Sequence, residues 1–291
     1  MNTEEKKLTP AESVSVALSY LQKQGHLLVR LGNELVDKDA PVTRAVLGFL
    51  MPAIADSCGS LSFLVPNRFR DAFVTGRTVY LTILNACFIC ALGPKSAERA
   101  LRHASQKAYR DLDRELKLND QKIVIRASSK PKADSDPRLK AAIDEFTWPK
   151  GREITQWTPE SPVQQLETIG SKYGENVAAT LGLSMMMLYR HASEIAHGTL
   201  FGVMWSVGVT SSRPRSISEP DVNRMREDHW SSSLEGLLFC LNASIATLFK
   251  IVSIEFPSCI DLKQESDALY QGLMVALGLR KKGKPGPSPS P

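Results

Sequence analysis

The sequence is a succession of helical segments, each bounded by residues that begin or end a helix. Thr9, Pro10 and Glu12 form a start signal, with a capping hydroxyl, a proline at the first helical position and a glutamate at the third. Gly93 and Pro94 form a stop signal. Because we find no strand-like alternation of polar and apolar residues, we expect an all-α fold.

The spacing of the apolar residues predicts a bundle of about seven to nine helices. Pro52 is expected to interrupt or kink the second of them. The expected helical segments are residues 9–35, 41–64, 67–92, 95–118, 138–146, 163–169, 174–209, 218–254 and 261–279.

Composition divides the chain into four parts. These are N-terminal helices that pack on a core (1–66), the core itself (67–256), a C-terminal helix (257–279) and a tail (280–291). Within the core, residues 127–162 are rich in proline, serine, lysine and aspartate and predict a loop-rich excursion, docked through Trp148 and Trp157. The basic, proline-rich tail cannot bury apolar surface and is expected to be disordered.

The net charge excludes one class of nucleic-acid binder. The chain of 291 residues carries a formal charge of +5. Four of the positive charges lie in the last twelve residues, on Arg280, Lys281, Lys282 and Lys284. The rest of the chain is therefore close to neutral and lacks the global positive field of a non-specific nucleic-acid binder. A phosphate group would have to bind at a local patch.

Cysteine usage and hydropathy predict a cytoplasmic location. The chain has five cysteines, an odd number, and most lie in apolar helical runs, which is typical of reduced, buried thiols. The N-terminus is polar and no apolar leader segment follows it. The longest uncharged stretches fall short of the roughly 20 apolar residues of a membrane-spanning helix, so we expect no membrane association.

The expected helix 95–118 is amphipathic. Its apolar face carries Leu101, Ala104, Ala108, Leu112 and Leu116. The opposite face carries the most concentrated basic stripe of the chain, and its candidate nucleic-acid-binding residues are Arg99, Arg102, Lys107, Arg110 and Arg114. Two interpretations stay open: a solvated helix face, or a track for a phosphate backbone or an acidic partner.

A second polar cluster lies on the expected helix around residues 189–197. Tyr189, Ser193 and His197 follow one another at a spacing of four and line one helix face. Arg190 and His197 are seven residues apart, which is about 20° short of two full turns. Their side chains would share a face, roughly 10 Å apart along the helix axis.

Such a strip has the groups that RNA cleavage without a metal requires. The ribose 2′-hydroxyl attacks the adjacent phosphate, and a neutral imidazole can accept its proton. A guanidinium can hold the non-bridging phosphate oxygens and stabilise the charge of the transition state. Two other interpretations stay open: a buried, hydrogen-bonded polar seam between helices, or a nucleotide- or RNA-binding strip without catalysis.

A metal site is not expected on this helix. His191, Glu194 and His197 follow at a spacing of three, but the two histidines lie about 120° apart around the helix. They do not form the pair at a spacing of four that binds zinc in helical metalloprotease motifs. We expect no cofactor and no metal.

The segment Arg190-His191 followed by five residues and His197 fits the R-x(4–6)-H signature of HEPN-domain proteins, at the long end of its spacing. The wider chain, from about residue 67 to 254, resembles an uncharacterised bacterial helical family related to HEPN. That likeness rests on two segments, one from Arg77 through Leu81 to Asn85 and one from Tyr189 through Ser193 to His197-Gly198.

The resemblance implies a HEPN-like helical bundle, here with extra N-terminal helices, that is commonly dimeric. Many HEPN proteins are ribonucleases of toxin or anti-phage defence systems, and others only bind. In one respect the chain departs from these relatives, because Leu81 stands where they have a glutamate four residues after the first arginine. Arg77 therefore lacks a local carboxylate, and it would either pair with Glu194 or help to hold a phosphate.

These observations lead to one functional hypothesis and one alternative. The hypothesis is a metal-independent endoribonuclease in which Arg190 binds the phosphate and His197 acts as general base or acid. The supporting residues would be Tyr189, His191, Ser193, Glu194 and Arg77. Its expected partners are a second copy of the chain, RNA and a protein from the same operon. The alternative is a non-catalytic interaction or nucleotide-binding module, such as a sensor or partner subunit of a bacterial defence operon.

Overall fold

The computed structural model describes residues 8–36, 40–119, 121–128, 133–208 and 219–280. Their first helices are α1 (Pro10–Leu35), α2 (Val42–Asn67), α3 (Phe69–Leu92), α4 (Pro94–Asp111), α5 (Pro137–Glu145), α6 (Pro162–Tyr173) and α7 (Glu175–Ser184). A π-helical turn, η2 (Met185–Tyr189), then leads into α8 (Arg190–Ala196), α9 (Leu200–Ser206), α10 (Glu219–Glu255) and α11 (Ile260–Ala276). Short 3₁₀ turns, η1 (Ala133–Ser135) and η3 (Pro257–Cys259), precede α5 and α11.

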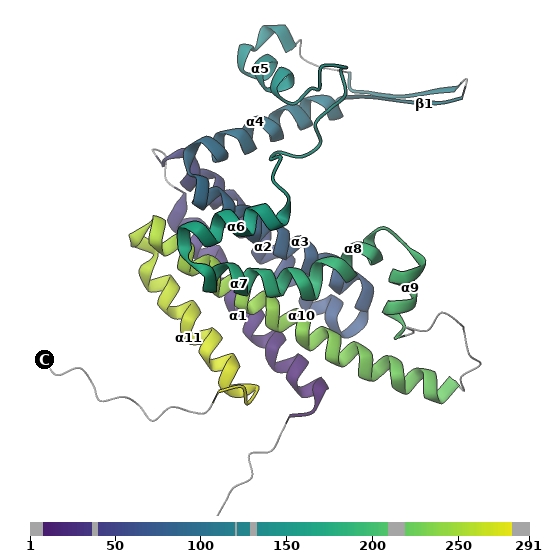
Figure 1. The fold of residues 1–291 in the computed structure, drawn as a ribbon, viewed down its shortest axis with the longest axis vertical. Helices are drawn as coiled ribbons and strands as arrows, with labels where there is room; N and C mark the ends of the chain where they lie inside the picture. The colour runs from purple at the N-terminus through teal and green to yellow at the C-terminus, as the bar shows by residue number, and fades with distance from the viewer. Residues whose placement is uncertain (1–7, 37–39, 120, 129–132, 209–218, 281–291) are drawn as a thin grey trace, which may run out of the picture.

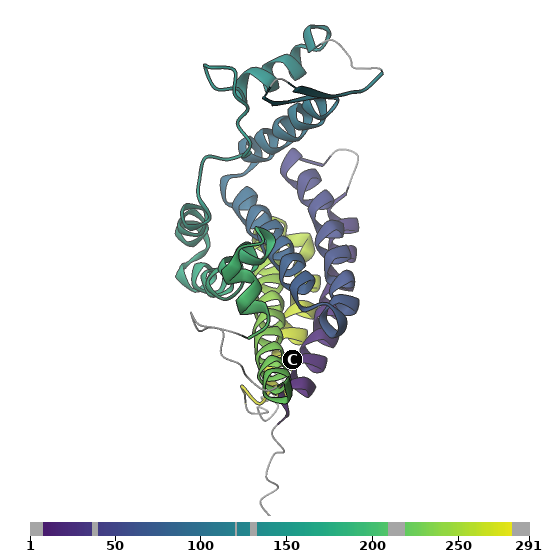
Figure 2. The same ribbon diagram turned by 90° about the vertical axis from the view of Figure 1, so that its right-hand side faces the viewer.

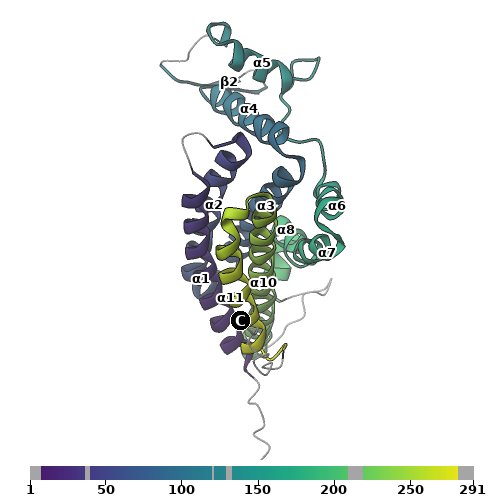
Figure 3. The ribbon, with the colours of Figure 1, turned by 90° about the vertical axis from the view of Figure 1, so that its left-hand side faces the viewer.

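The prediction of an all-α helical bundle is confirmed. Figure 3 shows three groups of helices side by side: α1 with α2, then α3 with α10 and α11, then α6 to α8. Helix α10 contacts α1, α3, α7 and α11, which places it at the centre of the bundle. In Figures 1 and 2, α4, α5 and a β-hairpin project together from one end of this bundle. We call this projecting part the arm.

One continuous core joins the parts of the chain that the sequence separates. Its buried side chains come from all three helix groups, from Ala17 in α1 to Leu273 in α11. In α10 every residue from 241 to 249 is buried. A helix that is enclosed on all sides needs apolar residues around its whole circumference, and this one has them. The N-terminal helices and α11 therefore belong to the same core as residues 67–256.

The five cysteines lie in this core as free thiols. Burial raises the pKa of Cys58 to about 12, and it likewise raises the pKa of Cys90 to about 12. A thiol is reactive as its thiolate, so these side chains are inert apolar filler at physiological pH. The expectation of reduced, buried cysteines is confirmed.

Two expectations about helix limits are wrong. Helix α2 is not interrupted at Pro52, whose ring packs close to Gly32 of α1. Helix α4 ends at Asp111, and residues expected to continue it to 118 form strand β1 (Asp113–Leu118), which is followed by strand β2 (Gln121–Arg126). The two strands pair antiparallel. At their turn Asn119 has a φ of 53°, a left-handed conformation that asparagine adopts more readily than most residues.

Three helices in the described part are long and apolar enough to cross a membrane by length and composition alone. They are α2, α3 and the stretch Asn223–Glu255 of α10. In the apolar 18-residue stretch of each helix, the bundle buries 83% of the residues in α10 and 39% of those in α2. The predicted cytoplasmic location and the predicted absence of membrane association stay predictions. The predicted disordered tail lies outside the described residues, apart from Arg280.

Buried polar side chains fix how the helices sit on one another. Gln24 of α1 and Ser266 of α11 are fully buried. The Ser266 hydroxyl donates to Gln24 Oε1 at 2.7 Å, and Gln24 Nε2 donates to the Ser266 carbonyl at 3.3 Å. Because a buried polar group without a partner is costly, this pair specifies the register of α11 against α1.

We expect Gln24→Ala to lower the free energy of unfolding by about 1–3 kcal/mol, because it leaves the Ser266 hydroxyl buried without its acceptor. Urea denaturation of Gln24→Ala, Ser266→Ala and the double variant measures the coupling between the two side chains. The double variant should lose less stability than the two single losses added together. Strictly additive losses would show that the two side chains act independently.

Candidate functional site

The candidate site lies where the chain passes from a π-helical turn into α8. The turn η2 comprises residues 185–189, and Arg190 is the first residue of α8. A π-helical turn inside a helix is uncommon and often marks a functional position. Met186 and Met187 of this turn are exposed, at 73% and 48%, and they precede Arg190 by four and three residues.

Arg190 and His197 both lie on the surface at opposite ends of α8. Helical backbone continues from Arg190 to the cap residue His197, whose N–H donates to the Ser193 carbonyl at 2.9 Å. The two side chains therefore share a face about two turns apart, as their spacing predicts. Because both are exposed, they do not belong to a buried seam.

Arg77 reaches the start of this helix from α3. Its guanidinium carbon lies 4.9 Å from the centre of the Tyr189 ring, a cation–π contact between residues far apart in the chain. Its Nε is buried and has no hydrogen-bond partner, and within the described residues the guanidinium forms no ion pair. The structure thus brings together Arg77 and Tyr189, next to Arg190, with a guanidinium that no carboxylate neutralises.

Glu194 does not pair with Arg77, which was one of the two expectations for that arginine. Its carboxylate instead accepts a hydrogen bond from Thr199 Oγ1 at 2.6 Å. Thr199 caps α9, and Gly198 has a φ of 64° at the turn between α8 and α9. A Cβ on Gly202 would lie 2.5 Å from the Glu194 backbone. Glu194 therefore holds the tight turn that places α9 against α8.

His191 lies on an aromatic cluster rather than with His197. Its ring stacks on that of Trp205, with the centroids 4.4 Å apart and the planes at 6°. His229 of α10 meets the same Trp205 ring edge-on at 4.9 Å. Burial lowers the pKa of both histidines, and the nearby Arg190 lowers that of His191 further. Both imidazoles are therefore held neutral by packing.

The residues expected to support catalysis thus divide into two groups. Tyr189 and Arg77 contact each other beside Arg190, whereas His191 and Glu194 serve the packing of α9. Ser193 is half-buried, and its carbonyl holds the N–H of His197. Within the described residues, no group of three or more histidine, cysteine, aspartate or glutamate side chains could hold a metal ion.

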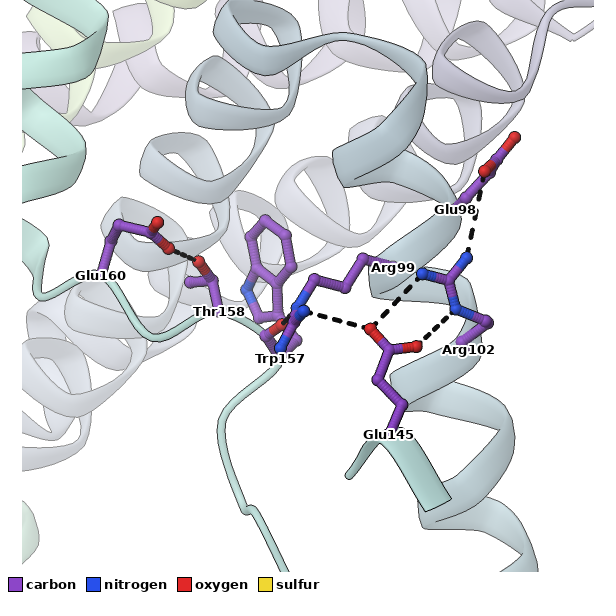
Figure 4. A network of polar contacts seen from close by, with 7 residues as sticks. All are labelled: Glu98, Arg99, Arg102, Glu145, Trp157, Thr158 and Glu160. Atoms are coloured by element: carbon purple, nitrogen blue, oxygen red, sulfur yellow. Dashed lines mark hydrogen bonds and ion pairs between the residues drawn. The ribbon is translucent and has the colours of Figure 1, made fainter. Parts of the chain in front are cut away.

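The basic stripe of α4 is an intramolecular contact surface. Arg99 and Arg102 both reach Glu145 at the end of α5, at 3.1 and 2.6 Å (Figure 4). Arg99 Nε also donates to the carbonyl of Trp157 at 2.8 Å. The Trp157 ring docks on Phe88 and donates from Nε1 to Asn85 of α3. The two arginines therefore bind the loop-rich excursion to α4.

The other three basic residues of the stripe also have protein partners. Lys107 Nζ lies 2.9 Å from a carboxylate oxygen of Glu153, and Arg110 donates to Thr147 Oγ1 at 2.6 Å. Arg114 lies in β1, not on a helix, and pairs with Asp111. Nucleic-acid binding by the stripe stays a prediction, but its charges are largely satisfied within the arm.

The apolar face of α4 is the exposed one, contrary to what an amphipathic helix leads us to expect. Leu101 is 41% exposed, and Ala104 and Ala108 also lie on the surface. The polar side packs on the excursion, where Gln106 is fully buried. Periodicity locates the two faces of a helix, but it does not say which one meets another polar segment.

In comparisons with protein-family models, with curated proteins and with solved structures, no match to this chain was found. Sequence reasoning missed the cluster of Trp205, His229 and Trp230 beside α8. Its only signal was the apolar, aromatic content of residues 200–207, which fits a core helix equally well.

We expect the stability of the protein to fall as the pH drops below 6.5, the ordinary histidine pKa. A lowered pKa in the folded state means that the unfolded chain binds more protons in this range, so acid favours unfolding. Above pH 6.5 this contribution to stability is fully present. His103, packed against Phe146, has a pKa lowered in the same direction by burial.

Urea denaturation between about pH 7.5 and about pH 5 measures this effect. Replacing His191 by phenylalanine keeps a ring on Trp205 but removes its titration, so the dependence on pH should become shallower. His26→Asn, an exposed substitution on α1, is the matched control. An unchanged dependence on pH in His191→Phe would rule out this histidine as a source of the effect.

Proposed function

We propose that the chain is a metal-independent endoribonuclease whose site is the strip of Arg190 and His197 on α8. The observation that carries the proposal is that both side chains are exposed on one helix face, while Arg77 brings a second guanidinium, unpaired within the described residues, to Tyr189. Positive groups without carboxylate partners favour a phosphate ligand.

The chemistry follows from these groups. His197 would accept the proton of a ribose 2′-hydroxyl as that oxygen attacks the adjacent phosphorus. Arg190 would donate hydrogen bonds to the non-bridging oxygens, where negative charge grows in the transition state. The bond from phosphorus to the 5′-oxygen then breaks, leaving a 2′,3′-cyclic phosphate, and the departing 5′-oxygen takes up a proton.

A homodimer would complete such a site. One imidazole per chain serves one proton transfer at a time, so a second strip facing the first would supply the proton for the leaving oxygen. Large apolar side chains are exposed on α7, η2 and α9, the segments that flank α8 in the chain, and exposed apolar patches mark association surfaces. These are Leu183, Met186, Met187, Leu200 and Phe201.

We expect the purified protein to cleave single-stranded RNA in the presence of EDTA, and His197→Ala to slow cleavage by about 100-fold or more. Arg190→Ala should also slow it, because the phosphate loses its charge-stabilising donor. His26→Ala, on an exposed face of α1, is the control for loss of a surface imidazole. Equal activity in the wild type and His197→Ala would refute the proposed role of His197.

A second candidate function, a non-catalytic interaction module, is favoured by the hairpin of the arm. The strand register places Leu116, Leu118, Ile123 and Ile125 on one face, and each is at least half exposed. The other face carries charged side chains, including Glu115, which pairs with Lys122. An apolar hairpin face open to water is suited to a protein partner, and we propose one encoded in the same operon.

This alternative predicts that replacing Leu116 and Ile123 by serine abolishes co-purification with the partner protein when the chain and that partner are expressed together. Replacing Lys117 and Lys122 by serine, on the opposite face of the same hairpin, is the matched control and should leave co-purification intact. Under this alternative, neither the wild type nor either double variant should cleave RNA. Partner binding that survives loss of the apolar pair would exclude the hairpin face.

A further inference from the structure

A pocket opens beside α8, at the corner where α2 turns into α3. Its charged residues come from that corner: Arg68, Arg70 and Asp71. Ile195 and Ala196 contribute from the end of α8, and Trp230 from α10. His197 does not line the pocket, but it follows Ala196 in the chain at the same end of α8.

The two arginines of the pocket are free to bind a ligand. Both are exposed, and neither guanidinium has an ion-pair or hydrogen-bond partner within the described residues. This distinguishes them from the arginines of α4, which bind Glu145. Two unpaired guanidinium groups on one pocket favour an anion with several acceptor oxygens, such as a phosphate.

Trp230 forms part of the pocket lining, and its ring is held in place. Trp230 stacks on the buried Phe69, with the ring centroids 5.2 Å apart and the planes at 9°. Its Nε1 donates to the Ser206 carbonyl at 2.7 Å, which fixes the ring. Arg226 lies against the same indole, 5.2 Å from its centre. An apolar wall keeps water from one side of the pocket and strengthens the attraction between the arginines and an anion.

Asp71 limits which phosphate suits the pocket. Its exposed carboxylate lines the same space and repels negative charge. A phosphodiester carries one negative charge, whereas a free phosphate or a terminal phosphate carries up to two near neutral pH. A carboxylate can also accept a hydrogen bond from a ribose hydroxyl. The combination favours a phosphate within a chain of nucleotides.

We propose that this pocket binds a phosphodiester of an RNA strand, next to the one that lies at His197. Arg68 and Arg70 hold its non-bridging oxygens, and the strand continues along α8 toward Arg190. That the bound strand is RNA rests on the proposed function. It adds a binding subsite that sets where the RNA lies relative to the reacting groups.

Binding is measured with a fluorescently labelled 2′-O-methyl oligoribonucleotide, which has no free 2′-hydroxyl and cannot be cleaved. We expect Arg68→Gln with Arg70→Gln to raise Kd about tenfold or more and to lower the slope of log Kd against log salt by about 1.4, as the loss of two phosphate contacts requires. Lys95→Gln with Lys150→Gln removes the same charge outside the pocket and is the matched control.

The outcomes separate this inference from the proposed function. If the arginine variant binds weakly but the wild type does not cleave RNA, the subsite stands and the nuclease proposal fails. If the wild type cleaves RNA while the arginine variant keeps its Kd and salt slope, the subsite is refuted and the nuclease proposal stands. Displacement of the oligonucleotide by millimolar inorganic phosphate would also refute the RNA subsite, since the pocket would then be a site for free phosphate. An unchanged Tm in the arginine variant verifies that its fold is intact.

Discussion

The burial of α10 is the interaction on which the rest of the structure depends. Residues 241–249 have no exposed side chain, so helices must surround them on every side. Two of their polar side chains are tied to neighbouring helices: Asn242 Nδ2 donates to the Ala17 carbonyl of α1, and the Ser244 hydroxyl donates to Ser184 of α7. Ser184 in turn donates to the Cys240 carbonyl. The helix that leads into η2 and α8 is therefore bonded directly to the centre of the bundle.

This anchoring explains the position of the candidate site. Helix α7 is fixed on α10, and α8 emerges from it toward the surface, where Arg190 and His197 meet water. The turn to α9 then closes back through Thr199 and Glu194 and sets Trp205 between His191 and His229. A rigid support on one side and an exposed face on the other are what an accessible site needs.

The sequence predicted those features that local chemistry determines. The start of α1 after its cap residue Thr9 follows from the capping residues, and the shared helix face of Arg190 and His197 follows from their spacing. The structure has both features. The hairpin was missed because its strands are short and lie next to an amphipathic helix whose period extends into Leu116. Contacts such as those of Glu145 with Arg99 and Arg102 depend on how the chain folds back, and spacing carries no information about them.

The π-helical turn before α8 has a consequence for how the surface strip is aimed. A π turn contains one residue more than an α turn, so it offsets everything that follows by about 100° around the helix axis. Deleting one of Met185, Met186 or Met187 would restore α-helical geometry and leave Arg190 and His197 facing as they do now, whereas the undeleted sequence in continuous α-helical geometry would turn both by about 100°. The π-helical turn thus takes up one extra residue, and the strip keeps the direction that it would have in an α-helix one residue shorter.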